Sequence, residues 1–427
     1  MHLTIEKLVY GGDGLARLPA DEHGRGKAVF LPFVLPGEEV EAELAEQKPG
    51  FARGRAQSIL QSSPQRVEPR CPHFQNCGGC HYQHTNYEHQ LEIKAAILKE
   101  NLRRIAKLEL ESELHTHPSP PWNYRNRTRL KVRSTSEFAI GYHRFNSHEL
   151  LPIEECPISS PLINRAIASF WQSGRAGTIP GDITEVEFFA NADDSQLLVE
   201  LYCSSDSQHA AEWAETVRAI LPQFVGVTVF RSAPPGAEPR QLSFSGVQDL
   251  SYQTEPAAYR VSAGAFFQVN RHLTSSLMRL VTNEQGGETA LDLYAGGGLF
   301  SAVLARSFAQ VIAVESSQIS HSDLAYNSPA NVKPVHAQVE VYLKNVPRRA
   351  QPGLIVVDPP RGGLGENVVR GIAGLQAPRL IYVSCDPATL ARDLAGLLKA
   401  GYRVEQAHLV DLFPQTYHLE SVIHLTR

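Results

Sequence analysis

The chain has 427 residues, a formal net charge of -5, and 42% hydrophobic and 20% charged residues, which is the composition of an ordinary globular protein with several domains. It contains no apolar run of about 18 residues and no apolar core behind Met1, which argues against a membrane-spanning helix and a signal peptide. We expect a monomeric, cytoplasmic protein without a membrane partner, in which disulfides are not expected among the six cysteines.

Residues 1–62 are expected to form a small all-β unit. Short apolar segments at 28–34 and 39–44 alternate with turn signals at 11–14 and 36–38, which are rich in glycine and proline. A five-stranded barrel is the simplest arrangement, because closure of the sheet removes exposed strand edges.

Three cysteines then occur within ten residues, and a fourth lies downstream. Cys71, Cys77 and Cys80 are spaced Cys-x5-Cys-x2-Cys with two glycines between them, and Cys156 follows in Glu-Glu-Cys-Pro. Four thiolates suit tetrahedral zinc or an iron–sulfur cluster. Structural zinc more often uses two Cys-x2-Cys pairs, so the pattern favours a [4Fe–4S] cluster. Zinc, with nearby histidines as further ligands, and unliganded thiols stay open as alternatives.

Residues 89–107 show apolar side chains at helical spacing, and 122–260 alternate strands with turns and some helix. Within this region basic residues occupy every second position: Arg125, Arg127, Arg129, Lys131 and Arg133. On a strand all five point to one face. Next to Trp122 and Tyr124, such a face suits an RNA backbone and unstacked bases. A solvated strand face is the alternative.

From residue 286 onward apolar strands alternate with helices. The expected strands are 289–293, 311–315, 354–358, 380–384 and 421–425, which predict a parallel sheet covered on both faces. The turn Gly296-Gly297-Gly298 follows the first strand, and Glu315 ends the second. A glycine turn followed by an acid that binds ribose hydroxyls fits NAD and S-adenosylmethionine alike.

Three further side chains stand at strand boundaries of this sheet. Asp358 follows one strand within Asp-Pro-Pro-Arg, and Cys385 follows the next within Ser-Cys-Asp-Pro. Ligands of open α/β sheets bind at these carboxyl ends. A helix N-terminus after Cys385 is expected to lower the pKa of its thiol and make it a nucleophile. Glu420 opens the last strand and is able to reach the same edge.

Taken together, these motifs resemble the RumA/TrmA family of RNA uracil-5-methyltransferases over nearly the whole chain. The likeness is closest to the RumA branch, which acts on 23S rRNA and has a TRAM domain and an iron–sulfur cluster. It implies a multidomain fold: an OB-like β-barrel (TRAM) at 1–62, a central α+β, RNA-facing domain with the cluster at 63–88 and 114–258, and a Rossmann-like α/β methyltransferase domain at 89–113 and 259–427.

The resemblance also implies roles for single residues. Cys385 would be the nucleophile that attacks C6 of uracil, Glu420 the base that removes the C5 proton, and Asp358 the group between cofactor and target base. Cys71, Cys77, Cys80 and Cys156 match the cluster ligands. The residues expected to contact S-adenosylmethionine are Gln268, Tyr294, Gly296, Gly298, Leu299, Glu315, Gln338 and Asp358. Ala295 and Leu299 depart from the family pattern, in which a cysteine and often an asparagine stand there.

Other functions stay open from the sequence. Transfer RNA is an alternative substrate within the same enzyme class. An NAD-dependent oxidoreductase with an iron–sulfur centre fits the glycine turn and Glu315, and a noncatalytic RNA-binding protein fits the basic face.

Overall fold

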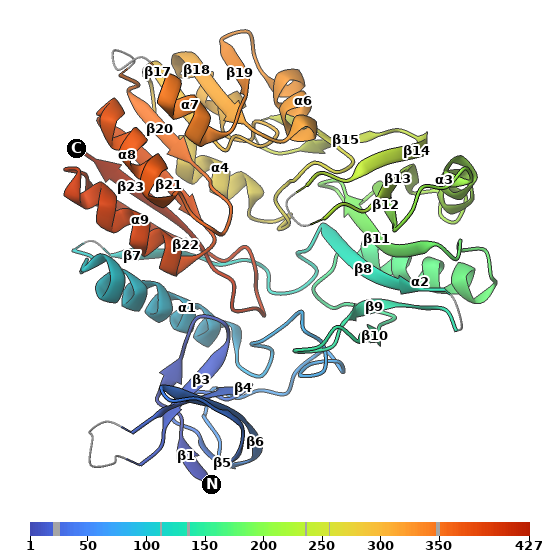
Figure 1. Ribbon diagram of the computed structural model, residues 1–427, viewed down its shortest axis with the longest axis vertical. Coiled ribbons are helices and arrows are strands. Elements are labelled where there is room, and N and C mark those ends of the chain that lie inside the picture. The colour runs from blue at the N-terminus through green and yellow to red at the C-terminus, as the bar shows by residue number, and fades with distance from the viewer. Residues whose placement is uncertain (20–25, 112, 135–136, 235–236, 256, 347–350) are drawn as a thin grey trace.

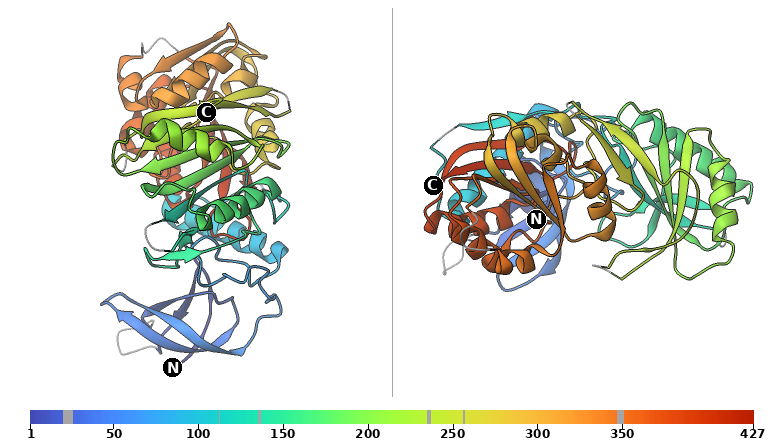
Figure 2. Two further views of the ribbon diagram at one scale, coloured as in Figure 1. Left: turned by 90° about the vertical axis from the view of Figure 1, so that its right-hand side faces the viewer. Right: turned by 90° about the horizontal axis from the view of Figure 1, so that it is seen from above.

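The computed structural model describes residues 1–19, 26–111, 113–134, 137–234, 237–255, 257–346 and 351–427. The chain folds into a small N-terminal sheet, a central mixed sheet and a large C-terminal sheet (Figure 1). The N-terminal sheet lies at the end of the molecule opposite β17–β19 of the C-terminal sheet (Figure 2). Within the described residues, none of the helices combines the length and apolarity that a membrane span requires.

The N-terminal sheet has six strands in the described residues, one more than the sequence suggested. They are β1 His2–Thr4, β2 Lys7–Leu8, β3 Asp13–Arg17, β4 Ala28–Pro32, β5 Glu39–Gln47 and β6 Phe51–Gln61, in the order β1-β5-β6-β4-β3-β2. The added strand is the two-residue β2, too short to give an alternation signal. Leu3, Val29, Leu31 and Val40 form the core of this sheet.

Helix α1 Tyr87–Asn101 follows, capped by the side chain of Asn86, and ends in the π-helical turn η1 Leu102–Ala106. It packs against the C-terminal helix α9 Pro387–Lys399. Strand β7 Leu114–His117 then joins the C-terminal sheet beside β22. The boundary expected before residue 114 is therefore wrong: residues 114–117 belong to the C-terminal domain, because β22 supplies their hydrogen bonds.

The central sheet has the order β10-β9-β8-β11-β12-β13-β14. Its elements are β8 Arg127–Arg133, β9 Ala139–His143, β10 Leu150–Pro152, α2 Pro161–Arg175, β11 Ile183–Ala190, β12 Leu197–Cys203, α3 Ala210–Arg218, β13 Phe224–Arg231 and β14 Arg240–Gly246. One face packs on α2 and α3 through residues such as Phe170 and Trp213. On the opposite face Leu198 and Tyr202 join the core of the C-terminal domain, which fixes the two domains against each other.

The C-terminal domain begins with the hairpin β15 Asp249–Gln253 and β16 Ala258–Ser262, because Leu250 and Tyr252 lie in its core. The boundary expected between residues 258 and 259 is therefore wrong. In the described residues, the main sheet of this domain has eight strands in the order β19-β18-β17-β20-β21-β23-β22-β7. The remaining elements are α4 Thr274–Thr282, β17 Gly287–Leu293, α5 Ser301–Leu304, β18 Phe308–Glu315, α6 Gln318–Asn327, β19 Val332–His336, α7 Val339–Asn345, β20 Leu354–Val357, α8 Gly365–Leu375, β21 Arg379–Ser384, β22 Arg403–Val410 and β23 Glu420–Thr426.

The five predicted strands are confirmed, but the sheet is mixed rather than parallel. Strands β17 to β21 run parallel, whereas β23 lies antiparallel between β21 and β22. The short connection from β22 to β23 allows only a reversal of direction. This reversal brings the start of β23 to the same edge as the ends of β20 and β21.

Candidate active site

Asp358, Cys385 and Glu420 meet at one edge of the C-terminal sheet. Asp358 follows β20, Cys385 follows β21, and Glu420 is the first residue of β23. In the register of β21 and β23, Ser384 stands opposite Ser421, so Cys385 and Glu420 are the next positions along the two strands. Strand reversal therefore places a thiol beside two carboxyl groups, as expected for a site at the ends of parallel strands.

Cys385 is half-buried, and its thiol is a weaker acid than the sequence suggested. Burial and the neighbouring carboxyls of Glu420 and Asp358 raise the pKa of the thiol to about 12. The amides at the start of α9 do not offset this, because the side chain of Asp386 accepts hydrogen bonds from Ala388 N at 3.0 Å and Thr389 N at 2.9 Å. The expected low pKa of this thiol is wrong for the free protein.

The two carboxyl groups also resist ionisation. Burial, followed by the charge of Asp358, raises the pKa of Glu420 well above its ordinary value. Burial, followed by Asp292, raises the pKa of Asp358 to about 7. Two carboxyl groups in one apolar site cannot both lose their protons easily. When one carboxyl of the pair is ionised, its raised pKa makes it a stronger base than an ordinary carboxylate, which is the property that a base in the site requires.

Arg361 and His418 belong to the same site, and the sequence analysis assigned neither of them a role. Nη2 of Arg361 lies 3.0 Å from Nδ1 of His418, and the arginine charge lowers the pKa of both Cys385 and Glu420. Burial and Arg361 lower the pKa of His418 to about 3, so its ring is neutral. The positions of both residues, three after Asp358 and two before Glu420, were the available signal.

The glycine turn after β17 faces the end of β18. Gly296 and Gly298 have φ values of 54° and 90°, and Tyr294 has a φ of 63°. The carboxylate of Glu315 accepts hydrogen bonds from the backbone amides of Gly296 at 2.8 Å, Ser316 at 2.8 Å and Ser317 at 2.7 Å. A carboxylate has about four acceptor positions, so Glu315 can still accept a hydrogen bond from one hydroxyl group. The turn and Glu315 form one unit, as a nucleotide site of this class requires.

The remaining expected cofactor residues differ in exposure. Gln268 is buried on the segment that leads into α4, and exposed Gln338 precedes α7. Leu299 packs into the apolar core, and its carbonyl accepts a hydrogen bond from Tyr259 at 2.8 Å, so its environment does not favour a polar contact. Buried Asp292 accepts from Ser301 at 2.5 Å, and its Oδ1 has no partner, which leaves an acceptor beside the turn.

The structure brings all four predicted ligand cysteines to one small hollow. Cys71, Cys77, Cys80 and Cys156 line a space of about 70 Å³ together with Arg125. All four thiols are free, and burial raises the pKa of Cys77 to about 11. In the described parts of the chain, however, no three His, Cys, Asp or Glu side chains are spaced to hold a metal ion.

Three members of the basic stripe are paired with carboxylates, which offset much of the positive charge expected on this strand face. Arg127 and Arg129 both bind Glu187 on β11, and Lys131 binds Glu185 on the same strand. Arg127 also binds Glu200 at 2.9 Å. Arg125 precedes β8 and faces the cysteine hollow, whereas Arg133, at the end of β8, is exposed.

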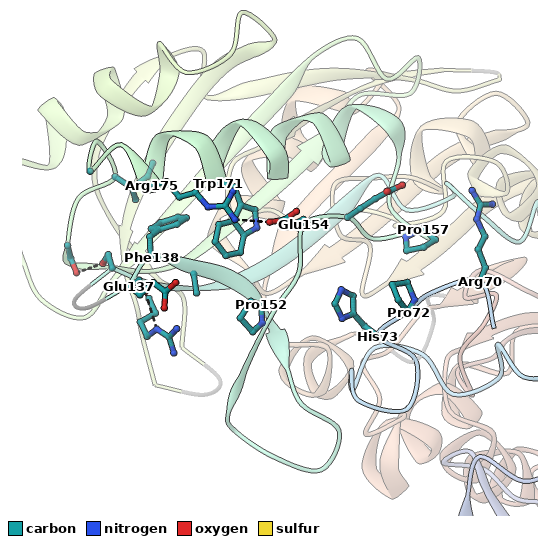
Figure 3. A pocket seen from close by; sticks show the side chains of 18 residues that line it. Arg70, Pro72, His73, Glu137, Phe138, Pro152, Glu154, Pro157, Trp171 and Arg175 are labelled. Atoms are coloured by element: carbon teal, nitrogen blue, oxygen red, sulfur yellow. Dashed lines mark hydrogen bonds and ion pairs between the residues drawn. The ribbon is translucent and has the colours of Figure 1, made fainter. Parts of the chain in front are cut away.

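A hollow of about 1200 Å³ lies on the central domain rather than at the sheet edge (Figure 3). Trp171 and Arg175 of α2 line one side, and His73 from the cysteine loop lies on another (Figure 3). Its described charges balance, with Arg70, Arg133 and Arg175 against Glu137, Glu154 and Glu155. This hollow does not have the positive potential that would favour a polyanion.

Two known protein families together match nearly all of the chain. The family described as tRNA (Uracil-5-)-methyltransferase matches residues 86–427, and the TRAM domain family matches residues 1–56. These two matches divide the chain close to the boundary between the N-terminal sheet and α1.

Similar proteins have names that refer to RNA methylation. A protein of Aquifex aeolicus named as an uncharacterized RNA methyltransferase is 32% identical, with 99% of this chain and 97% of the relative covered. The 23S rRNA (uracil(1939)-C(5))-methyltransferase RlmD of Shewanella piezotolerans is 31% identical, with 99% and 94% covered. The corresponding RlmD of Chromohalobacter salexigens is 32% identical, with 100% and 89% covered.

A solved structure shares the fold. It is the tRNA (uracil-54, C5)-methyltransferase of Pyrococcus abyssi in complex with S-adenosyl-L-homocysteine, with a TM-score of 0.78, 24% identity and 100% of both chains covered. At this identity the likeness concerns the arrangement of the domains.

Proposed function

Because the chain belongs to the tRNA (uracil-5-)-methyltransferase family and begins with a TRAM domain, we propose that it transfers a methyl group from S-adenosylmethionine to C5 of a uridine in 23S rRNA. The observation that carries the chemistry is the meeting of Cys385, Asp358 and Glu420 at one sheet edge. The full-length relatives named RlmD favour ribosomal RNA as the substrate.

The described residues fit S-adenosylmethionine. Gly296 has no heavy atom within 4 Å of an added Cβ, so space is left above the turn, and Glu315 lies beside it with one acceptor position for a ribose hydroxyl. The unpartnered Oδ1 of Asp292 adds a buried acceptor near the same turn. When bound, the cofactor supplies an electrophilic methyl group on a sulfonium sulfur.

Uracil C5 is a weak nucleophile, and Cys385 is proposed to activate it. In the proposal the Cys385 thiol gives its proton to water, and the sulfur bonds to C6 of the ring, so that electrons move toward C5 and O4 as an enolate. C5 then accepts the methyl group. Removal of the C5 proton by Glu420 restores the double bond between C5 and C6 and releases the Cys385 sulfur. Asp358 holds the uracil edge between the thiol and the cofactor turn.

A ring stacked inside an RNA helix cannot reach this edge, so the target nucleotide has to leave its stack. Phe266 is 65% exposed and stands two residues before Gln268, which is expected to contact the cofactor. An exposed aromatic ring at that position is suited to stack on an extruded base.

We propose in addition that Cys71, Cys77, Cys80 and Cys156 hold a [4Fe–4S] cluster. The fit is supported by Arg125, whose buried Nε has no hydrogen-bond partner and which lines the same hollow as the four thiols. A cluster with four thiolates is anionic, and a neighbouring guanidinium would offset that charge. The cluster would fix Cys156 to the loop at 71–80 and so hold the central domain to the segment that leads into α1.

Transfer RNA is the second substrate class, because the family description refers to tRNA. Mapping 5-methyluridine in ribosomal and transfer RNA, from cells with the gene, without it, and with Cys385→Ala in its place, separates the two. The proposal expects one or more 23S rRNA positions to lose methylation in the second and third strains. Loss confined to tRNA would assign the other substrate, and unchanged RNA in both strains would remove the proposed function.

A further inference from the structure

The side chain of Tyr10, in the N-terminal domain, contacts the catalytic edge. Its hydroxyl donates a hydrogen bond of 3.1 Å to the backbone carbonyl of Cys385. Its ring also packs edge-on against Tyr417, with 5.4 Å between the ring centroids. Tyr417 stands three residues before Glu420. One residue of the N-terminal domain therefore contacts both the nucleophile loop and the segment that leads to the base.

The turn that carries Tyr10 is held firmly in place. Gly11 and Gly12 follow it with φ values of 108° and 95°, a conformation that favours glycine. A Cβ on Gly12 would lie 3.1 Å from the Cβ of His81, so the backbone of the turn packs closely on the segment after the cysteine loop. His81 in turn packs on Tyr417, with 4.6 Å between ring centroids. The turn therefore packs between the segment after the cysteine loop and the catalytic edge.

Apolar packing fixes the same contact from the other side. Leu8, two residues before Tyr10, and Leu35 belong to the core that is formed mainly by the C-terminal domain. The side chain of Lys7 also forms an ion pair with Glu100 on α1. The interface between the two domains therefore combines a shared apolar core with an ion pair. These contacts hold the Tyr10 hydroxyl in one position.

The hydrogen bond acts on a backbone group that matters for the reaction. The carbonyl of Cys385 lies between the last residue of β21 and the first turn of α9, and its orientation sets the direction of the Cys385 side chain. Burial and the charge of Asp386 raise the pKa of the Tyr10 hydroxyl above its ordinary value, so it keeps the proton that it donates. A small error in the direction of an attacking atom is costly in rate.

We infer that Tyr10 is a positioning residue for the Cys385 nucleophile, so that the N-terminal domain completes the catalytic site rather than only contacting RNA. The inference rests on the proposed function for its catalytic consequence. Its effect on the reactivity of Cys385 is independent of any RNA substrate.

The test compares Tyr10→Phe with Tyr82→Phe in the full-length protein. Tyr82 lies in the same interface, is fully buried, and has a hydroxyl without a partner, so it controls for the loss of a tyrosine oxygen. The alkylation rate of Cys385 by iodoacetamide is measured from pH 7 to 10 by mass spectrometry of the peptide that contains it. The kcat and KM for methyl transfer to a 23S rRNA fragment and the melting temperature are measured in parallel.

Tyr10→Phe is expected to change the alkylation rate of Cys385 and to lower kcat about fivefold, the effect of one lost hydrogen bond, with KM for RNA within twofold. Tyr82→Phe is expected to match the wild type in each of these quantities. Wild-type alkylation and kcat in Tyr10→Phe would overturn the inference. A rise in KM alone, with unchanged alkylation, would make Tyr10 an RNA contact and would also overturn it.

These outcomes are separable from failure of the proposed function. If the wild-type protein forms no 5-methyluridine, the proposed function falls, but the alkylation comparison still decides whether Tyr10 orients Cys385. If methylation proceeds and both phenylalanine variants behave alike, only the inference about Tyr10 falls.

Discussion

Replacement of Asp358 by asparagine is expected to make the Cys385 thiol react faster with an alkylating reagent and yet to abolish methyl transfer. The charge of Asp358 raises the pKa of Cys385, which reaches about 12, so that at pH 8 about one thiol in ten thousand is ionised. Removal of one neighbouring negative charge lowers a thiol pKa by about one unit. At a given pH the variant should therefore contain about ten times more thiolate.

Stability should not mask this effect. The pKa of Asp358 is raised to about 7 in the folded protein from an ordinary value of 3.8. A carboxyl with a raised pKa stabilises the fold most below pH 3.8, and that contribution is lost as the pH rises to about 7. Above pH 7 the ionised carboxylate costs stability, so Asp358→Asn should melt no lower than the wild type at pH 8.5.

The assay is iodoacetamide alkylation of Cys385 between pH 7 and 10, followed by peptide mass spectrometry. The wild-type rate should rise about tenfold per pH unit without a plateau, because the range lies below the pKa of about 12. Asp358→Asn should react about ten times faster at pH 8.5 and yet lose methyl transfer. Glu366→Gln is the matched control, because it removes an exposed carboxylate at the start of α8. Equal or slower alkylation of Asp358→Asn, or a wild-type plateau near pH 8, would refute the reasoning.

Three further variants test other parts of the account. Glu420→Gln should leave a covalent RNA–protein band on denaturing gels, because the C5 proton then has no acceptor; release of free RNA at the normal rate would assign the base elsewhere. Lys94→Met should lower the free energy of unfolding by about 3–5 kcal/mol in urea titrations, since buried Asp411 loses its partner at 2.6 Å; a change below ~1 kcal/mol would contradict this. Cys156→Ser should lower the iron and acid-labile sulfide of anaerobically purified protein, whereas Cys203→Ser should not. Zinc without sulfide in the wild type would exclude the cluster.

The sequence predicted the parts of the fold that give periodic or continuous apolar signals. Strands β20 and β21 were evident because both of their faces are buried, as Leu354–Val357 and Arg379–Ser384 show. Strand β22 was missed because the first half of Arg403–Val410 is polar and partly exposed. Strand β7 was missed because its four residues include two histidines. The wrong prediction of a parallel sheet follows from the omission of β22, because the short connection from β22 is what reverses β23.

The site was predicted where chemistry and position coincide in one short segment. Asp358 and Cys385 follow the ends of two parallel strands, so their meeting could be expected from strand order. Glu420 opens its strand and reaches the same edge because β23 runs antiparallel, which was not predicted. The state of the thiol could not be predicted, because it depends on the summed effect of burial and of two carboxyls from other strands. The contact of Tyr10 with Cys385 could not be predicted either, because the two residues lie 375 positions apart in the chain.

The basic stripe shows a different limit. Alternation correctly predicted that Arg127 and Arg129 lie on a strand, but the carboxylates that neutralise them come from β11 and β12. Glu200 is surrounded in the sequence by apolar residues and gave no sign of pairing. Strand register decides such pairs, and register depends on the whole sheet.

The claim on which the account depends is the bond between the sulfur of Cys385 and C6 of the target uridine. It is tested most directly by incubating the wild-type protein with S-adenosylmethionine and a 23S rRNA fragment that carries 5-fluorouridine, in which no C5 proton can be removed. The account predicts a stable RNA adduct that mass spectrometry locates on the peptide with residue 385. An adduct on another residue, or none with RNA whose unmodified form is methylated normally, would contradict it.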